Sequence, residues 1–331
     1  MNYITKNNPT YIFKSVPIKN IDVDDQLTNF SWGIPTDSLQ QSIEEVGVIH
    51  PVTLVSVGNG FRIVCGHRRI KTSSQLQTKE IPARILDIAP SDETMLMLNL
   101  SENQLHHHYS DIEKGRILFK LSEARVPEIR IIEKYMPMLG LEKSKKLLDD
   151  HLKSNQLVLG LKNLLHELNV PIRIFSVLFN WNTESAIAAE RFFSVLRPGV
   201  NKWRNLLEWI DEISTRDQIA PLDLFELPEL QSILNRNDLA PNVRYDRIRQ
   251  ILHSKRYPIL SDLRVRLARS LDALKLDDKT KVHVQDSFES DEIRIEMKFR
   301  TREEFVGQVE KLVRASDSEA LDGLISIFKD P

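Results

Sequence analysis

Over the first 90 residues, short apolar runs alternate with short amphipathic segments. The apolar runs predict strands at 16–23, 48–57, 61–66 and 81–88, and the amphipathic segments predict helices at 39–47 and 67–76. The pair Asn59-Gly60, between the second and third strands, is a hairpin turn signal. The pattern therefore predicts a compact domain of mixed helices and strands.

From about residue 91 the apolar positions recur with helical spacing, and this continues to a break near 217–226. Ser110 with Glu113, three residues later, is a candidate capping box for one of these helices. After the break, the pattern predicts two helices at 240–256 and 259–275 and a hairpin at 281–299.

The predicted fold class is α+β, in three parts. Residues 1–95 form a small α/β domain, residues 96–218 an all-helical middle with a candidate helix-turn-helix, and residues 219–331 a small α+β unit of a hairpin and helices. A length of 331 residues fits this division, at about 100–200 residues per domain.

Composition narrows the class of protein. Hydrophobic residues make up 41% and charged residues 28%, so wholesale disorder is excluded. The single cysteine, Cys65, excludes an internal disulfide framework and a Cys-rich zinc site. No apolar run reaches the roughly 18 residues that cross a membrane, and the first residues lack the apolar region of a signal peptide. We therefore expect a cytoplasmic protein with no membrane partner.

Charge is unevenly distributed along the chain. The formal net charge of −2 excludes a uniformly basic surface but not a local basic patch. Residues 244–269 carry eight lysines and arginines but only two acidic residues. This stretch is therefore the first candidate for contact with a polyanion.

The most informative run is 61–72, where a strand is followed by a glycine and a basic helix start. A helix N-terminus has unpaired N–H groups that favour anions, and Gly66 allows close approach of the backbone. Arg68 or Arg69 could grip phosphate oxygens in a bidentate manner. The alternative is that the two arginines form ordinary surface ion pairs.

A second run, 99–113, carries oxygen-bearing side chains. Glu102 and Asn103 are of the kind that hold Mg²⁺ through one or two contacts while phosphates supply the rest. The alternative is a solvated helix face. Three histidines follow at 106–108, but consecutive helical residues point about 100° apart, so we interpret them as a helix junction rather than a metal site.

These runs carry a resemblance in three pieces. The first is a leucine-and-serine helix ending in Gly before a Pro, at Leu39, Ser42, Ile43, Gly47 and Pro51. The second is a G-E-R-R-x-R-A motif, matched by residues 66–72, and the third is E-N-x-x-R followed by L-S-x-x-E, matched from Glu102 to Glu113. In this order and spacing, residues 16–115 resemble the N-terminal domain of ParB-type chromosome and plasmid partition proteins, which share the sulfiredoxin fold.

The resemblance implies CTP and Mg²⁺ as ligands. It places nucleotide contacts on Gly47, Gly66, His67, Arg68, Arg69, Lys71 and Asn103, metal contacts on Glu102 and Asn103, and a catalytic role in a weak CTPase activity on Glu102. The chain departs from the motifs at His67 for Glu, Lys71 for Arg, Thr72 for Ala and His106 for Arg. The family's N-P-x-x-P-R segment has no clean match, and residues 29–35 occupy that stretch.

Two regions are candidates for DNA contact. In family members a helix-turn-helix follows this domain, and residues 128–152 fit one, with Lys143, Ser144, Lys145 and Lys146 near the start of the second helix. The alternative is a plain helical bundle with solvated lysines. In the basic stretch the candidates are Arg244, Arg247, Lys255, Arg256, Arg264 and Arg266, or else an arginine-rich face paired with the acidic residues at 289–292.

Together these features predict a DNA-binding, ParB-like protein under CTP·Mg²⁺ control, with a partition or regulatory role. We expect a homodimer associated with the nucleoid. One alternative is a Mg²⁺-dependent enzyme on the same fold, such as a nuclease or a small-molecule kinase. The other is a degenerate adaptor that has lost nucleotide binding.

Overall fold

The computed structural model describes residues 10–33, 37–86, 90–104, 107–285 and 292–329. The chain divides into two compact units, Met1–Leu207 and Glu208–Pro331, and each is described on its own. The division into three domains, at 1–95, 96–218 and 219–331, stays a prediction. Among the residues searched, no helix is both long and apolar enough to cross a membrane.

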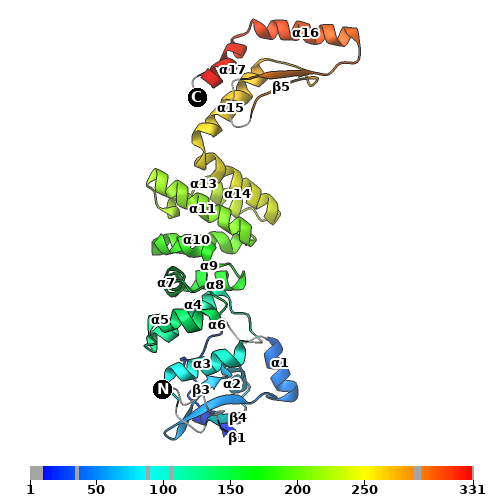
Figure 1. The fold of residues 1–331 in the computed structure, drawn as a ribbon. Coiled ribbons are helices and arrows are strands. Elements are labelled where there is room, and N and C mark those ends of the chain that lie inside the picture. The colour runs from blue at the N-terminus through cyan, green and yellow to red at the C-terminus, as the bar shows by residue number, and fades with distance from the viewer. Residues whose placement is uncertain (1–9, 34–36, 87–89, 105–106, 286–291, 330–331) are drawn as a thin grey trace. The chain divides into compact units, whose positions relative to one another are not determined.

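The first unit begins with a four-stranded sheet in the order β1-β4-β2-β3 (Figure 1). The strands are β1 (Tyr11–Pro17), β2 (Val52–Val57), β3 (Gly60–Cys65) and β4 (Glu80–Leu86). β1 pairs with β4 and β3 with β2 in antiparallel fashion, whereas β2 and β4 are parallel. The mixed α+β class predicted from the sequence is confirmed.

The first predicted strand, 16–23, is misplaced. The strand β1 ends at Pro17, and Ile18–Asn20 form a 3-10 turn, η2. Proline has no N–H to continue a strand ladder, so the strand lies before it rather than after it.

Helices pack on both faces of the sheet, which explains why four consecutive residues of the inner strand β2, Val52–Val55, are buried, whereas most of the edge strand β1 is exposed. The helices are α1 (Asp37–Val46), α2 (His67–Gln75) and α3 (Asp92–Asn103). Ile70 of α2 packs with Leu54 and Ile63 on one face. Met95 of α3 packs with Val55 and Val64 on the other. Consecutive strand residues therefore enter opposite cores.

The rest of the first unit is helical. Its elements are α4 (Asp111–Glu123), α5 (Glu128–Arg130), the π-helical turn η3 (Ile131–Tyr135), α6 (Met136–Met138), α7 (Lys145–Ser154), α8 (Leu159–Glu167), α9 (Ile172–Phe175), the 3-10 turn η4 (Ser176–Asn180), α10 (Thr183–Leu196) and the first part of α11 (Val200–Asp217), whose remainder belongs to the second unit. The capping box at Ser110 is confirmed: its Oγ accepts from the Glu113 N–H at 3.3 Å, and Glu113 Oε2 accepts from the Ser110 N–H at 3.0 Å.

The pair of helices predicted at 128–152 is present. One helical run spans α5 to α6, a turn follows in which Gly140 has φ +69°, and α7 starts after Ser144, whose Oγ accepts from the Leu147 N–H at 3.2 Å. Its role as a DNA-binding helix-turn-helix stays a prediction.

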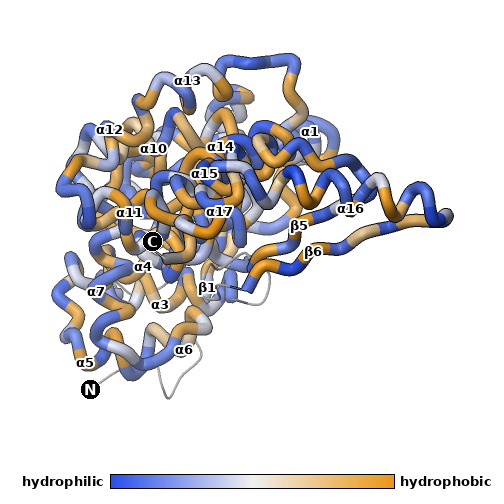
Figure 2. Tube along the Cα trace, turned by 90° about the horizontal axis from the view of Figure 1, so that it is seen from above, coloured by the Kyte–Doolittle hydropathy of each residue, from blue (hydrophilic) through white to orange (hydrophobic). Residues whose placement is uncertain are grey.

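The second unit contains α12 (Pro221–Phe225), α13 (Pro228–Leu234), α14 (Pro241–Arg256), α15 (Pro258–Ala273), β5 (Thr280–His283), β6 (Arg294–Met297), α16 (Arg302–Ser316) and α17 (Glu319–Lys329). The predicted hairpin is confirmed, with Thr280 opposite Met297. Polar and apolar positions interleave along these helices (Figure 2), and Leu263, Leu324 and Ile327 join α15 to α17. Most of the acidic tip at 289–292 lies outside the described residues.

Candidate functional site

The predicted anion turn lies between β3 and α2. Gly66 is the N-cap of α2 with φ +107°, and a Cβ at this position would lie 2.7 Å from Val52 Cγ1. Both the backbone conformation and the contact therefore require glycine. No acidic residue lies in the first turn of α2, so its unpaired N–H groups and positive dipole end are not neutralised from within the helix.

A cavity of about 230 Å³, the Gly66 pocket, opens at this turn. It is lined by Thr28, Asn29, Phe30, Ser31, Cys65, Gly66, His67, Arg68, Arg69, Asn99, Asn103, His107 and Tyr109. Five of the predicted nucleotide-binding residues, namely Gly66, His67, Arg68, Arg69 and Asn103, therefore meet in one place.

The sequence did not indicate that residues 28–31 form one wall of this pocket. Asn99 of α3 fixes that wall, since its Nδ2 donates to Thr28 O at 3.0 Å and to Val64 O at 2.6 Å. The one available signal was the absence of a clean family motif over 29–35. The missing motif showed that this stretch differs from the family's sequence, but it did not indicate that the stretch packs against the Gly66 turn.

His67 contributes a hydrogen bond rather than a charge. Its Nε2 donates to Asp25 O at 3.2 Å, and burial lowers the pKa of the imidazole to about 4. At neutral pH His67 is therefore uncharged. The charge of the turn comes from Arg68 and Arg69, and Arg69 is oriented by donating to the carbonyls of His50 and, at 3.0 Å, Pro51.

The amide nitrogen of Asn103 is occupied by Asn99, so the side-chain oxygen is the atom that can contact a ligand. Asn103 Nδ2 donates to Asn99 Oδ1 at 2.8 Å and to Asn99 O at 2.9 Å, and it contacts Cys65 Sγ at 3.4 Å. Burial raises the pKa of the Cys65 thiol to about 12, so this cysteine packs as a small apolar residue.

Glu102 does not line the Gly66 pocket, although its charge helps to raise the pKa of Cys65, which does. Its Oε2 forms an ion pair with Arg84 and accepts from Thr53 Oγ1 at 3.1 Å. Among the residues searched, no three His, Cys, Asp or Glu side chains gather as metal ligands. The catalytic and metal roles of Glu102 stay predictions, and in this arrangement its carboxylate is already neutralised.

Gly47 and Lys71 also lie apart from the pocket. Gly47 ends α1, where its N–H donates to Ile43 O at 3.0 Å. Lys71 lines a neighbouring cavity of about 370 Å³ on the other side of Asn29 and His67. Their predicted nucleotide contacts remain untested.

The lysines at the start of α7 are mostly paired within the protein. Lys143 lies 2.5 Å from Glu133, and Lys145 pairs with Glu128 and, at 3.1 Å, with Asp149. Ser144 serves as the N-cap of α7, and Lys146 is exposed.

The basic stretch in the second unit is only partly available to a ligand. Lys255 pairs with Glu229 at 3.3 Å, Arg256 pairs with Glu212 at 2.6 Å, and Arg244 donates to Arg236 O at 2.7 Å. Arg247, Arg264 and Arg266 form no ion pair within the part of the chain that the structure describes.

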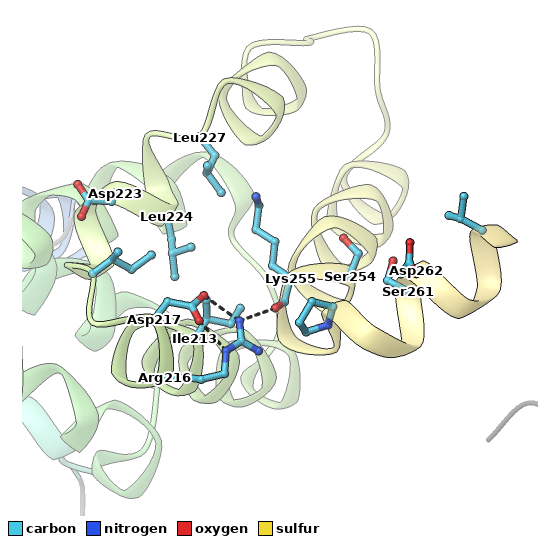
Figure 3. Close-up of a pocket in the computed structure, with 13 residues that line it drawn as sticks. Ile213, Arg216, Asp217, Asp223, Leu224, Leu227, Ser254, Lys255, Ser261 and Asp262 are labelled. Carbon is cyan, nitrogen blue, oxygen red and sulfur yellow. Dashed lines mark hydrogen bonds and ion pairs between the residues drawn. The ribbon is translucent and has the colours of Figure 1, made fainter. Parts of the chain in front are cut away.

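A cavity of about 640 Å³ lies beside this stretch, between the end of α11, α12, α14 and the start of α15. Figure 3 shows Arg216 turned toward Asp217 and the carbonyl of Lys255. Because Arg216 and Lys255 both have acidic partners, this cavity offers little unbalanced positive charge.

Comparison with known proteins locates the strongest likeness in the first third of the chain. A family model described as the ParB N-terminal domain matches residues 7–104. The probable plasmid-partitioning protein ParB of Thermus thermophilus is 33% identical over 72 residues, 21% of this chain and 24% of that protein. The chromosome-partitioning protein ParB of Myxococcus xanthus is 30% identical over 118 residues, 34% of this chain and 39% of that protein.

Among solved structures, the chain is similar to the C-terminally truncated ParB of Caulobacter crescentus. The form complexed to the centromeric parS site shares 13% identity at a TM-score of 0.34, covering 59% of this chain and 98% of that one. The form complexed with CTP-γ-S shares 16% identity at a TM-score of 0.26, covering 54% and 97%.

The matches to the curated relatives thus span well under half of their lengths. The family model covers the sheet and the Gly66 turn. Residues 7–104 are therefore identified as a ParB N-terminal domain, like that of the partition proteins to which the chain is similar.

Proposed function

We propose that this chain is a DNA-binding partition protein whose Gly66 pocket holds the phosphates of a nucleotide. The expected nucleotide is CTP. The observation that carries the proposal is the meeting of a glycine-required helix start with Arg68, Arg69 and Asn103 around one cavity. Helix N–H groups and arginines are the common protein partners of phosphate.

Magnesium would enter with the nucleotide. Asn103 Oδ1 is the protein oxygen best placed to contact it, since the amide nitrogen is already occupied, and the phosphates would supply most other ligands. A bound Mg²⁺ neutralises phosphate charge. Because Glu102 pairs with Arg84, we expect binding to be tighter than in a site with a free carboxylate, and hydrolysis to be slow.

The wall of the pocket connects it to the helical body. Ser31 O accepts from Arg116 of α4 at 3.2 Å, and the Trp32 N–H donates to Glu113 at 3.1 Å. A nucleotide that shifts residues 28–31 would therefore shift α4 with them. This link supports nucleotide control of DNA binding by the helices, with a homodimer as the expected working form.

Calorimetry on the full chain tests the proposal directly. We expect CTP with Mg²⁺ to bind, and Arg68→Ala to weaken binding by about tenfold or more, because a charge-assisted hydrogen bond contributes about 1.5–3 kcal/mol. The matched control is Arg191→Ala, an exposed arginine on α10, which should bind CTP within about twofold of the parent.

Absence of binding by CTP, ATP and GTP alike would overturn the nucleotide part and favour the adaptor alternative. Mg²⁺-dependent turnover of DNA, or of a nucleotide without DNA, would instead favour the enzyme alternative.

A further inference from the structure

A second group of cations lies on the helical body, against the segment that follows the pocket wall. Arg116 and Lys120 come from α4, and Lys162 comes from α8. The Arg116 guanidinium and the Lys162 ammonium each lie 5.5 Å from the centroid of the Trp32 ring. We call these four residues the Trp32 cluster. The ring is held in place because its Nε1 donates to Asn163 Oδ1 at 2.8 Å.

The cations of this cluster bond to carbonyls rather than to carboxylates. Arg116 donates to Ser31 O at 3.2 Å, Lys162 donates to Asn155 O at 2.9 Å, and Lys120 donates to Gln26 O. Within the described residues, none of the three forms an ion pair with an acidic side chain.

Other cations of the same unit are neutralised. Lys114, two residues before Arg116, pairs with Asp111 at 3.0 Å, and Arg130 pairs with Glu93 at 2.8 Å. Glu113, the acid that acts on Arg116, is buried and already accepts from the N–H groups of Ser110 and Trp32. Of the two acids that act on Lys120, Asp25 pairs with Arg62, which leaves Glu123. The Trp32 cluster is therefore a local excess of positive charge.

Keeping these partly buried cations charged raises the free energy of the protein without a ligand. Burial, and after it the charge of Arg116, lowers the pKa of Lys120 to about 8, and the same two causes lower the pKa of Lys162. Burial also lowers the pKa of Arg116, against the opposing effect of Glu113. A bound anion would remove this penalty, and such perturbed groups gather at functional sites.

The surroundings favour an extended anion over a small one. The Gly66 pocket and the cavity beside it are lined by other residues, so Arg116 and Lys162 do not belong to either cavity. Both are half-buried on two different helices, whereas Lys120 is only 9% exposed. Small ligands need a concave site, but a backbone phosphate can meet cations on an open surface.

We propose that Arg116 and Lys162 contact phosphates of the DNA backbone. The Trp32 ring positions both cations, and the buried Lys120 of α4 adds positive charge. The inference rests on the proposed DNA binding and assigns part of it to the surface of α4 and α8. It differs from the predicted sites at Lys143–Lys146 and 244–269, which lie elsewhere in the chain.

Salt dependence tests this assignment. Binding of the full chain to a mixed-sequence DNA duplex is measured over a range of salt concentrations for the parent and for the double variant R116Q with K162Q. Each lost phosphate contact lowers the slope of log K against log salt by about 0.9, so the slope should fall by about 2 and the affinity by about tenfold or more.

The matched control is R191Q with K79Q, which removes the same charges from exposed positions on α10 and just before β4 and should leave the slope unchanged. R116K, which keeps the charge, should retain most of the slope, and thermal unfolding checks that each variant is folded.

Three outcomes would overturn the assignment in different ways. If the parent binds DNA and R116Q with K162Q keeps its slope, the Trp32 cluster is not a phosphate contact while the proposed function stands. If that variant loses CTP affinity but not the DNA slope, the phosphate belongs to the nucleotide. If the parent shows no salt-dependent DNA binding, the proposed function itself fails.

Discussion

The Gly66 pocket and the Trp32 cluster both gather cations against the same segment, residues 26–32, but they do so differently. In the pocket, the cations follow one another at a helix start, and the backbone supplies part of the site. In the Trp32 cluster, single residues from α4 and α8 converge on one ring. The first arrangement surrounds a cavity with N–H groups and arginines, and the second presents charge on partly exposed side chains.

This difference decides what each region can bind. A pocket with fixed N–H groups selects a ligand by shape, whereas surface cations select mainly by charge and lose affinity as salt rises. We therefore expect nucleotide binding at Gly66 to depend weakly on salt and DNA binding at the Trp32 cluster to depend strongly on it.

The largest expected effect of a single change is at Gly66. Gly66→Ala places a Cβ against Val52 at a backbone conformation that favours glycine, so we expect a loss of about 3 kcal/mol in unfolding free energy and no nucleotide binding. Gly199→Ala, where a Cβ meets no atom within 4 Å, is the control for chemical denaturation. An unchanged stability of Gly66→Ala would refute the strict glycine requirement.

A second comparison uses two histidines, one beside the Gly66 pocket and one in the helical body that carries the Trp32 cluster. Burial lowers the pKa of His67, beside the pocket, and of His151, on α7 against α4, from 6.5 to about 4. Both are neutral in the folded state while the unfolded chain takes up protons below pH 6.5. Stability should therefore be fully present above pH 6.5 and fall as pH drops toward 4, by about 1.4 kcal/mol per pH unit for each histidine.

Denaturant unfolding at pH 7 and pH 5 measures this slope. His151→Gln should remove about half of the loss, because its Nε2 has no hydrogen-bond partner in the described residues and its Nδ1 donates only to Asp111 O at 3.2 Å. A pH profile that is the same in His151→Gln as in the parent would contradict this account of the helical body.

The smallest expected effect comes from the ring of the Trp32 cluster. Trp32→Leu removes two cation–π contacts, worth about 0.5–1 kcal/mol each, and should weaken DNA binding by about fivefold. Trp32→Phe keeps an aromatic face but loses the bond to Asn163, and should lie between Trp32→Leu and the parent. Equal affinities for all three proteins would show that the ring does not position the cations.

How far the sequence predicted these regions depends on how local their determinants are. The Gly66 turn could be predicted because its glycine, its arginines and the flanking strand and helix are contiguous. The capping box at Ser110 and the hairpin of β5 and β6 were predicted for the same reason.

The rest depends on contacts between distant segments. The sheet order places Arg84 of β4 and Thr53 of β2 beside Glu102, and the sequence did not indicate that this carboxylate would have an arginine partner. The Trp32 cluster joins residues from 32 to 162, and no periodicity indicates that a loop tryptophan will meet α4 and α8. Charge counting pointed to 244–269, yet several of those cations have internal partners.

We propose that the two regions bind different phosphates, the Gly66 pocket those of a nucleotide and the Trp32 cluster those of DNA. The most direct measurement determines CTP affinity and the salt dependence of DNA binding on Arg68→Ala and on R116Q with K162Q, side by side. We expect Arg68→Ala to lose CTP affinity and to keep the salt slope of DNA binding, measured without nucleotide. We expect R116Q with K162Q to keep CTP affinity, while its salt slope falls by about 2. Loss of both properties together in each variant would contradict the proposal, since the two regions would then form a single site.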